Sequence, residues 1–409
     1  MGPQGSSICL AMNSFDPGLD WAILANRGCP AADELALGLL HIRALCSLAP
    51  ERPPILDAEG PAPAAECPIL VLNCDMDHPD GPDGAARGFS WRAGEARIEF
   101  YGDSRHGLFL AIADFFDALG LWWPEPGKPP VLSHSAHAAA SGDLALTRST
   151  QYSDGNDERL CLAVPAALCA RWGGRDSIRM GSEILEWASR IGFDAVLVLM
   201  DAKVSAFQPS PEQLWDRVRA QMAETAHRIG ISLELGGSCM NKVIPRAPFR
   251  RHKEWWRMKN GKRIRDVNFC ATNPAALAAV AACAIERIRR LPEAEAIHLH
   301  GSGKEGDSWC HCPSCRAFSP AEQELLALNA IADALDRTAT PGLLALPVDR
   351  DETSDPGAIK PRPRVRPRPV QISLEDMAQW KSVLASAAAI GAVRCGRTAP
   401  QRPGTGNEA

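Results

Sequence analysis

The sequence predicts an α/β protein: an N-terminal α+β domain followed by a (β/α) TIM-barrel-like domain that is truncated. From about residue 145, short apolar segments alternate with amphipathic segments of helical length. Repeated β-α units of this kind predict a parallel sheet, open or closed into a barrel. Residues 193–200 are apolar at nearly every position, as in a strand that is buried on both faces. Only about five strands can be counted, so an eight-stranded barrel would be incomplete.

The N-terminal α+β domain is predicted over residues 1–132, and residues 133–144 have the composition of a linker. Apolar residues recur with helical spacing in two segments, and two further segments have the composition of strands. The expected helices cover about 31–48 and 105–119, and the expected strands cover 69–72 and 97–101.

The second domain is predicted over residues 145–346. Each of its three clearest helices begins with a capping Ser or Asn followed by Pro, a favoured pair at helix N-termini. The pairs are Ser210-Pro211, Asn273-Pro274 and Ser319-Pro320. Strands are expected near residue 147 and over 193–200, 231–235, 296–300 and 342–346.

Residues 347–409 are expected to be a disordered tail. The segment 361–369 alternates proline with arginine, a composition that cannot build a packed core.

Composition excludes several classes of function. The chain has 409 residues, of which 45% are apolar and 23% charged, and its formal net charge is -5. Outside the tail no basic patch suggests nucleic-acid binding. No apolar run reaches the roughly 18 residues of a membrane span. Residues 1–10 lack the features of a signal peptide. We therefore expect a cytoplasmic protein, or an extracytoplasmic one if the N-terminus is incomplete, and its oligomeric state stays open.

Residues 296–315 concentrate reactive side chains after a predicted strand, and strand-end loops commonly carry the active sites of α/β proteins. Glu305 and Asp307 lie in this segment, two residues apart. Glycoside hydrolysis needs two carboxyl groups, one of which acts as general acid. Either residue could be that acid, and Asp201, at the end of the 193–200 strand, could line the same pocket. The alternative is a solvated acidic loop.

Cys310, Cys312 and Cys315 follow a C-x-C-x2-C pattern that suits a structural zinc ion. Zinc usually takes four ligands, and the sequence does not choose the fourth. The candidates are His298, His300, His311 and Cys283. A disulfide with one free thiol, or three reduced cysteines, are the alternatives. No cofactor is expected to be required for the chemistry itself.

Two further features of the sequence bear on ligand binding. Gly301 to Gly306 match G-x-G-x-x-G, but no helix follows directly, as a nucleotide-binding fingerprint would require. Trp309, Trp256 and His300 are candidate sugar-binding residues, because indole faces stack on sugar rings.

Three segments of the chain resemble bacterial carbohydrate-active proteins. Residues 22–124, with Arg97-Ile-Glu-Phe-Tyr-Gly-Asp-Ser-Arg-His-Gly-Leu, are similar to the N-terminal domain of beta-N-acetylhexosaminidases and alpha-glucuronidases. Residues 235–274, with His252-Lys-Glu-Trp-Trp, and the cysteine segment are similar to an uncharacterised glycoside-hydrolase-like domain family. Where relatives tend to have histidine after the Gly-Gly pair, this chain has Ser238.

The resemblance implies hydrolysis of O-glycosidic bonds in poly- or oligosaccharides, with a carbohydrate substrate. It also implies that Glu305 and Asp307 follow the fourth strand of the barrel, where hexosaminidases have an acidic pair. Because the barrel is truncated, a non-catalytic carbohydrate-binding or metal-stabilised scaffold protein is the alternative.

Overall fold

The computed structural model describes the chain in two compact units. One unit comprises residues 1–158, 189–192 and 372–409, and the other comprises residues 159–188 and 193–371. The described residues are 14–61, 67–74, 88–94, 96–132, 144–145, 150–153, 161–166, 169, 177–200, 209–244, 247–301, 308–347, 359–368 and 371–373. None of the helices in these ranges is long and apolar enough to cross a membrane.

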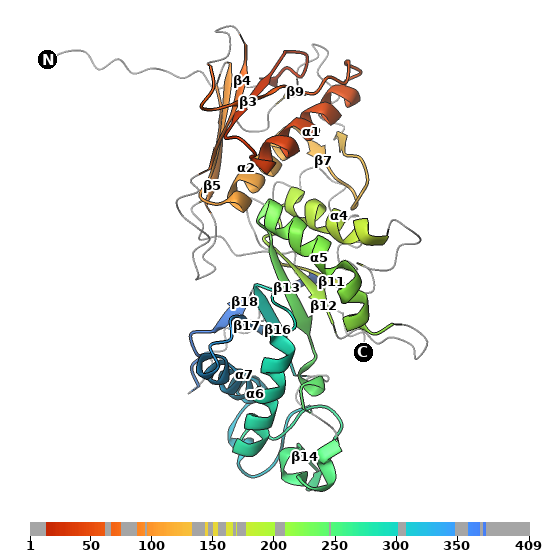
Figure 1. The fold of residues 1–409 in the computed structure, drawn as a ribbon, viewed down its shortest axis with the longest axis vertical. Helices are drawn as coiled ribbons and strands as arrows, with labels where there is room; N and C mark the ends of the chain where they lie inside the picture. Colours follow the sequence, from red (N-terminus) through yellow and green to blue (C-terminus); the bar gives the residue numbers. More distant parts are fainter. Residues whose placement is uncertain are drawn as a thin grey trace, which may run out of the picture. The chain divides into compact units, whose positions relative to one another are not determined.

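The first unit contains a six-stranded sheet with α1 (Pro30–Leu45) and α2 (Arg105–Ala118) packed against it (Figure 1). The strand order is β10-β5-β6-β4-β2-β3, with β2, β3, β4 and β6 parallel and β5 and β10 antiparallel. The strands are β2 (Ala22–Ala25), β3 (Ile55–Asp57), β4 (Ile69–Cys74), β5 (Phe89–Ala93), β6 (Arg97–Gly102) and β10 (Thr150–Ser153). Two short pairs complete it, β1 (Ser14–Phe15) with β9 (Leu144–Ala145) and β7 (Leu121–Trp122) with β8 (Val131–Leu132).

Phe115 of α2 is at the centre of this unit's core. Its ring contacts Trp91 and Phe100 edge-to-face, with ring centroids 5.3 Å apart in both pairs. The Trp91 indole N–H donates to the buried Asp114 carboxylate at 2.8 Å, so its polar atom is paired inside the core.

The second unit contains a seven-stranded sheet in the order β18-β17-β16-β13-β12-β11-β19. Its strands are β11 (Cys161–Pro165), β12 (Ala195–Leu199), β13 (Ser232–Gly237), β16 (Ala296–Leu299), β17 (Leu343–Pro347), β18 (Val365–Arg368) and β19 (Gln371–Ser373). All neighbours from β11 to β18 pair in parallel. The predicted α/β class is therefore confirmed.

The second unit's helices begin where the sequence predicts. Ser210 and Ser319 form capping boxes with Gln213 and Glu322, and the Asn273 side chain accepts a hydrogen bond from the Ala276 amide. The helices are α4 (Ser177–Arg190), α5 (Pro211–Ile229), α6 (Pro274–Ile288) and α7 (Pro320–Arg337). Between β13 and α6 the chain forms a small hairpin of β14 (Met258–Lys259) and β15 (Lys262–Arg263).

The sheet of the second unit is strongly curved. β18 and β19 are at opposite ends of the strand order, six strand spacings apart, which in a flat sheet corresponds to about 29 Å. Yet only two residues connect β18 to β19 along the chain, so the Cα atoms of Arg368 and Gln371 are at most about 11 Å apart. In agreement with this curvature, Nε of Arg368 on β18 lies 3.1 Å from a carboxylate oxygen of Glu234 on β13. Among the described residues the strand order nevertheless has two ends, and the barrel is not closed.

Two expectations need correction. The segment 361–369 is not wholly outside the fold, because Val365 is buried and β18 pairs with β17. Pro367 is tolerated because β18 is an edge strand, and Arg364 pairs with Asp336 of α7. The first parallel strand is β11 rather than a strand near 147. Even so, β16 is the fourth strand of the second unit's parallel sheet in chain order among the described residues.

Candidate functional site at the carboxyl end of the parallel sheet

Polar side chains gather on the concave face of the curved sheet. The register aligns Gly236 with His298 and His298 with Ala345, and these small neighbours leave room for large side chains. Side chains alternate along a strand, so Glu234 and His298 project from the same face. Both are about 1% exposed, and Arg368 is 6% exposed. A buried charge is stable only when it is paired, and here Glu234 and Arg368 form an ion pair with each other.

A chain of hydrogen-bonding groups connects this buried face with the end of β16. Nε2 of His298 lies 2.6 Å from Glu234, and its Nδ1 lies 3.1 Å from Nε2 of His300. Nδ1 of His300 lies 3.2 Å from Glu324 near the start of α7. His300 and Glu324 are 12% and 14% exposed, so the chain runs from the sheet interior toward solvent.

Burial affects the protonation of His298. Burial lowers the pKa of His298, although hydrogen bonding to Glu234 opposes the shift. A neutral His298 that donates to Glu234 through Nε2 presents Nδ1 as an acceptor for Nε2 of His300.

Close backbone packing explains the glycine at position 236. Its φ is +135°, and a Cβ atom there would lie 2.0 Å from the carbonyl oxygen of His298. Only glycine fits this approach of β13 to β16.

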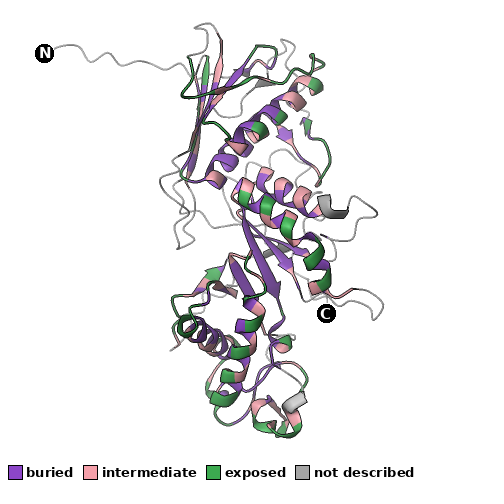
Figure 2. Ribbon diagram, in the orientation of Figure 1, coloured by how far each residue is buried: buried purple, intermediate pink, exposed green. Residues whose placement is uncertain are grey.

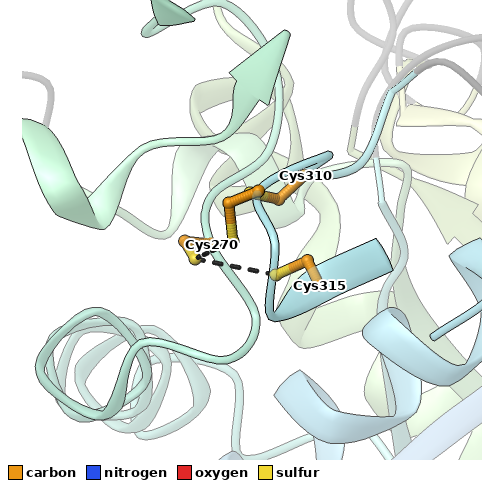
Figure 3. A group of neighbouring side chains, drawn as sticks. Cys270, Cys310 and Cys315 are labelled. Carbon is orange, nitrogen blue, oxygen red and sulfur yellow. Dashed lines mark hydrogen bonds between the residues drawn. The ribbon is translucent and has the colours of Figure 1, made fainter. Parts of the chain in front are cut away.

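Four buried thiols form a cluster beside this end of the sheet, and we call Cys270, Cys310, Cys312 and Cys315 the cysteine cluster. All four sulfur atoms lie within 4.8 Å of one another. Sγ of Cys270 is 3.6 Å from Sγ of Cys315 (Figure 3). It is also 3.7 Å from Sγ of Cys312. Zinc–sulfur bonds of about 2.3 Å in a tetrahedron place sulfur atoms about 3.8 Å apart. The cluster can therefore hold a metal ion.

Cys270 is the fourth member, which the sequence analysis did not consider. None of the four candidates named from the sequence supplies it, and His298 instead bonds Glu234 and His300. Hydrogen bonding with the Cys310 and Cys315 thiols lowers the pKa of Cys270, which favours the thiolate that a metal requires. Cys270 lies 40 residues before Cys310 and outside any compact motif, so spacing alone could not have found it. Only its place in Asn268-Phe-Cys-Ala-Thr-Asn-Pro, a segment singled out for another reason, pointed to it.

The cysteine cluster joins two parts of the chain. Cys270 follows the β14–β15 hairpin, and the Met258 amide donates to Sγ of Cys310 at 3.3 Å. The His311 amide donates to the Met258 carbonyl at 2.8 Å, and the Cys270 amide donates to the Trp255 carbonyl at 2.8 Å.

The acidic segment, residues 302–307, lies outside the described residues, but both of its ends are fixed. The Gly301 amide donates to Glu324 at 3.0 Å, and Asn268 donates to the Ser308 carbonyl at 3.0 Å. A Cβ atom on Gly301 would lie 2.8 Å from the Trp309 indole. The chain thus enters and leaves the acidic segment at neighbouring points beside the cysteine cluster.

The other predicted site residues are distributed as follows. Glu305, Asp307 and Asp201 lie outside the described residues. Trp256 is fully buried against Phe249, and Trp309 is 3% exposed against Phe269. Of the three predicted sugar-binding residues, His300 is the most exposed.

The buried ion pair of Glu234 and Arg368 should be strongly coupled. Glu234→Gln and Arg368→Met should each lower the free energy of unfolding by about 3–5 kcal/mol, because each removes a buried partner and leaves Arg368 with only Glu295 at 3.6 Å, or Glu234 with only His298. The double variant should cost less than the sum, with a coupling energy of about 1–3 kcal/mol in urea titrations. The matched control is the exposed pair Glu286 and Arg289, which should couple by about 0.5 kcal/mol or less. Equal coupling in both pairs would contradict the structure.

Comparisons with known proteins add a domain assignment. Residues 205–378 match a family model described as a domain of unknown function, DUF4838. None of the curated proteins matches the chain.

Similar solved structures include a chitobiase from Flavobacterium johnsoniae, at 11% identity and a TM-score of 0.47, covering 84% of this chain and 52% of that one. A beta-N-acetylhexosaminidase from Streptomyces coelicolor A3(2) has 10% identity and a TM-score of 0.45, covering 94% and 71%. A family 89 glycoside hydrolase from Clostridium perfringens has 12% identity and a TM-score of 0.37, covering 70% and 35%. The chain thus spans about half the length of the chitobiase. The matched residues, 205–378, contain both the polar face and the cysteine cluster, and this part of the chain is similar to the family described as a domain of unknown function, DUF4838.

Proposed function

We propose that this protein binds carbohydrate and hydrolyses glycosidic bonds in poly- or oligosaccharides at the carboxyl end of the curved sheet. The observation that carries the proposal is the anchoring of the acidic segment between Glu324 and the cysteine cluster. Glu324 bonds Gly301 and Asn268 bonds Ser308, the two residues that flank the acidic segment in the sequence. Ligands of α/β sheets commonly bind beyond the carboxyl ends of the strands.

In this proposal Asp307 or Glu305 protonates the leaving-group oxygen, and the other carboxylate acts as base or orients the substrate. Asp201, which follows β12 by two residues in the sequence, is a further candidate carboxylate. His300, bonded to Glu324, acts as a positioning residue at the start of the acidic segment and is a candidate contact to the sugar.

The catalytic proposal is tested with a panel of aryl glycosides. Asp307→Asn and Glu305→Gln should lower kcat/KM by about 100-fold or more, the usual contribution of a general acid. Asp201→Asn should have a smaller effect. Glu286→Gln is the control, because Glu286 is an exposed carboxylate on α6 and should leave the rate unchanged. Equal rates in wild type, Asp307→Asn and Glu305→Gln would overturn the site assignment.

A non-catalytic carbohydrate-binding or metal-stabilised scaffold protein is the second candidate. The cysteine cluster favours it, since a closed set of four thiols stabilises a fold without taking part in chemistry. Glycan-array binding by a preparation that cleaves none of the glycosides would support this candidate over the first.

We also propose that the cysteine cluster binds a structural zinc ion. Four thiolates favour zinc in a closed tetrahedral site, and the sulfur distances agree with that geometry. The zinc ion would hold the β14–β15 hairpin and the end of the acidic segment together.

Metal content separates the proposed ligands from other cysteines. A reduced, zinc-supplemented preparation should retain about one zinc ion per chain after dialysis. Cys270→Ser should retain far less, whereas Cys283→Ser should bind zinc like the wild type, because Cys283 of α6 lies outside the cluster. The proposal fails if the wild type holds no zinc or if Cys270→Ser holds as much as Cys283→Ser.

A further inference from the structure

The hairpin attached to the cysteine cluster carries a concentrated positive charge. Residues 250–266, which we call the basic hairpin, contain eight Lys or Arg and two Asp or Glu, a formal charge of +6. The whole chain has a formal net charge of -5, so the residues outside the hairpin have a formal net charge of -11. The positive charge is therefore local to the basic hairpin and opposite in sign to the charge of the rest of the molecule.

Several of these cations face solvent. Arg250, Arg251, Lys253 and Lys262 are exposed, and Figure 2 colours much of the surface around β14 as exposed. The two carboxylates do not neutralise them, because Asp266 pairs with the buried Arg257 and Glu254 lies 3.4 Å from His252.

The basic hairpin also carries a stacked aromatic pair. The rings of His252 and Trp255 lie 4.2 Å apart with an angle of 13° between their planes. Both rings are partly exposed; His252 lies between Arg251 and Lys253 along the chain, and Trp255 follows two residues after Lys253. Aromatic faces beside cations suit a ligand that has both apolar ring faces and negative charges.

The hairpin is held in place before any ligand arrives. Arg263 donates to the Trp256 carbonyl at 2.6 Å, and the amides of Met258 and Cys270 bond to Cys310 and Trp255. A fixed set of charges loses little conformational entropy on binding.

We propose that the basic hairpin is a binding surface for an anionic polysaccharide, whose charges are carboxylates or sulfate esters. This inference rests on the proposed function, since it identifies the substrate class of the same site. The cysteine cluster connects the basic hairpin to Ser308 and Trp309, the residues that directly follow the acidic segment in the sequence. A sugar chain is favoured over nucleic acid because the chain as a whole is acidic, with an isoelectric point near 6.1.

The test measures dissociation constants of the full chain at low ionic strength, where surface charges are least screened. The ligands are polygalacturonate, dextran sulfate, neutral dextran and a single-stranded oligonucleotide. The wild type should bind polygalacturonate, dextran sulfate or both, and the pair of results identifies carboxylate or sulfate as the recognised group. Tighter binding to the oligonucleotide, or equal binding to neutral dextran, would overturn the inference.

A charge-matched comparison assigns the binding to this surface. The triple variant Arg250→Gln, Arg251→Gln and Lys253→Gln should weaken binding by about tenfold. Conversion of the two arginines to lysine should preserve most of the affinity. The control removes three exposed cations elsewhere in the unit, Arg217→Gln, Arg290→Gln and Arg337→Gln, and should have little effect. An equal loss in both triple variants would show that net charge alone is responsible.

Hydrolysis assays on the wild type keep this inference separate from the catalytic proposal. Binding of the anionic polymer with no cleavage of any glycoside would support the proposed binding surface and contradict the proposed glycosidase activity. Cleavage of neutral aryl glycosides without binding of either polyanion would support the glycosidase activity and contradict the binding surface.

Discussion

The ion pair between Arg368 and Glu234 is the interaction on which the architecture of the second unit depends. It joins an edge strand to a strand three places away across the curved sheet. Both side chains are nearly excluded from water, so loss of one leaves the other charge with a single weaker partner, Glu295 for Arg368 and His298 for Glu234. His298 bonds Glu234 and passes the connection to His300 at the strand end. The same buried network therefore fixes the curvature of the sheet and the position of the first residue after β16.

The cysteine cluster provides a second constraint, which acts outside the sheet. It brings together a thiol that follows the β14–β15 hairpin and three that follow the acidic segment. Glu324 bonds the residue before the acidic segment, and Asn268, close to the cluster, bonds the residue after it. The residues on both sides of this six-residue segment are therefore held by separate contacts. The basic hairpin shares one of these anchors. A proposed catalytic segment and a proposed binding surface would thus depend on the same four sulfur atoms.

Much of the fold could be predicted because local signals agree with the tertiary structure. The cap and proline at Ser210, Asn273 and Ser319 start helices, and the apolar run at 193–200 contains a central strand. Predictions failed where contacts between residues far apart in the sequence determine the structure. Val365 is buried although its neighbours are proline and arginine, because β17 offers an edge to pair with. Cys270 joins the cysteine cluster across 40 residues of sequence, and Glu234 finds Arg368 across more than 130, so neither partner has a local signature. The assignment of Glu305 and Asp307 stays a prediction.

The most direct measurement of the central claim is the dependence of the Asp307→Asn and Glu305→Gln rates on the leaving group. A variant that lacks the general acid cannot protonate a poor leaving group, but it retains activity toward aryl groups that depart without a proton. Our account predicts that one of the two variants loses far more activity on alkyl glycosides than on nitrophenyl glycosides. A loss of the same size for every leaving group, in both variants, would contradict it.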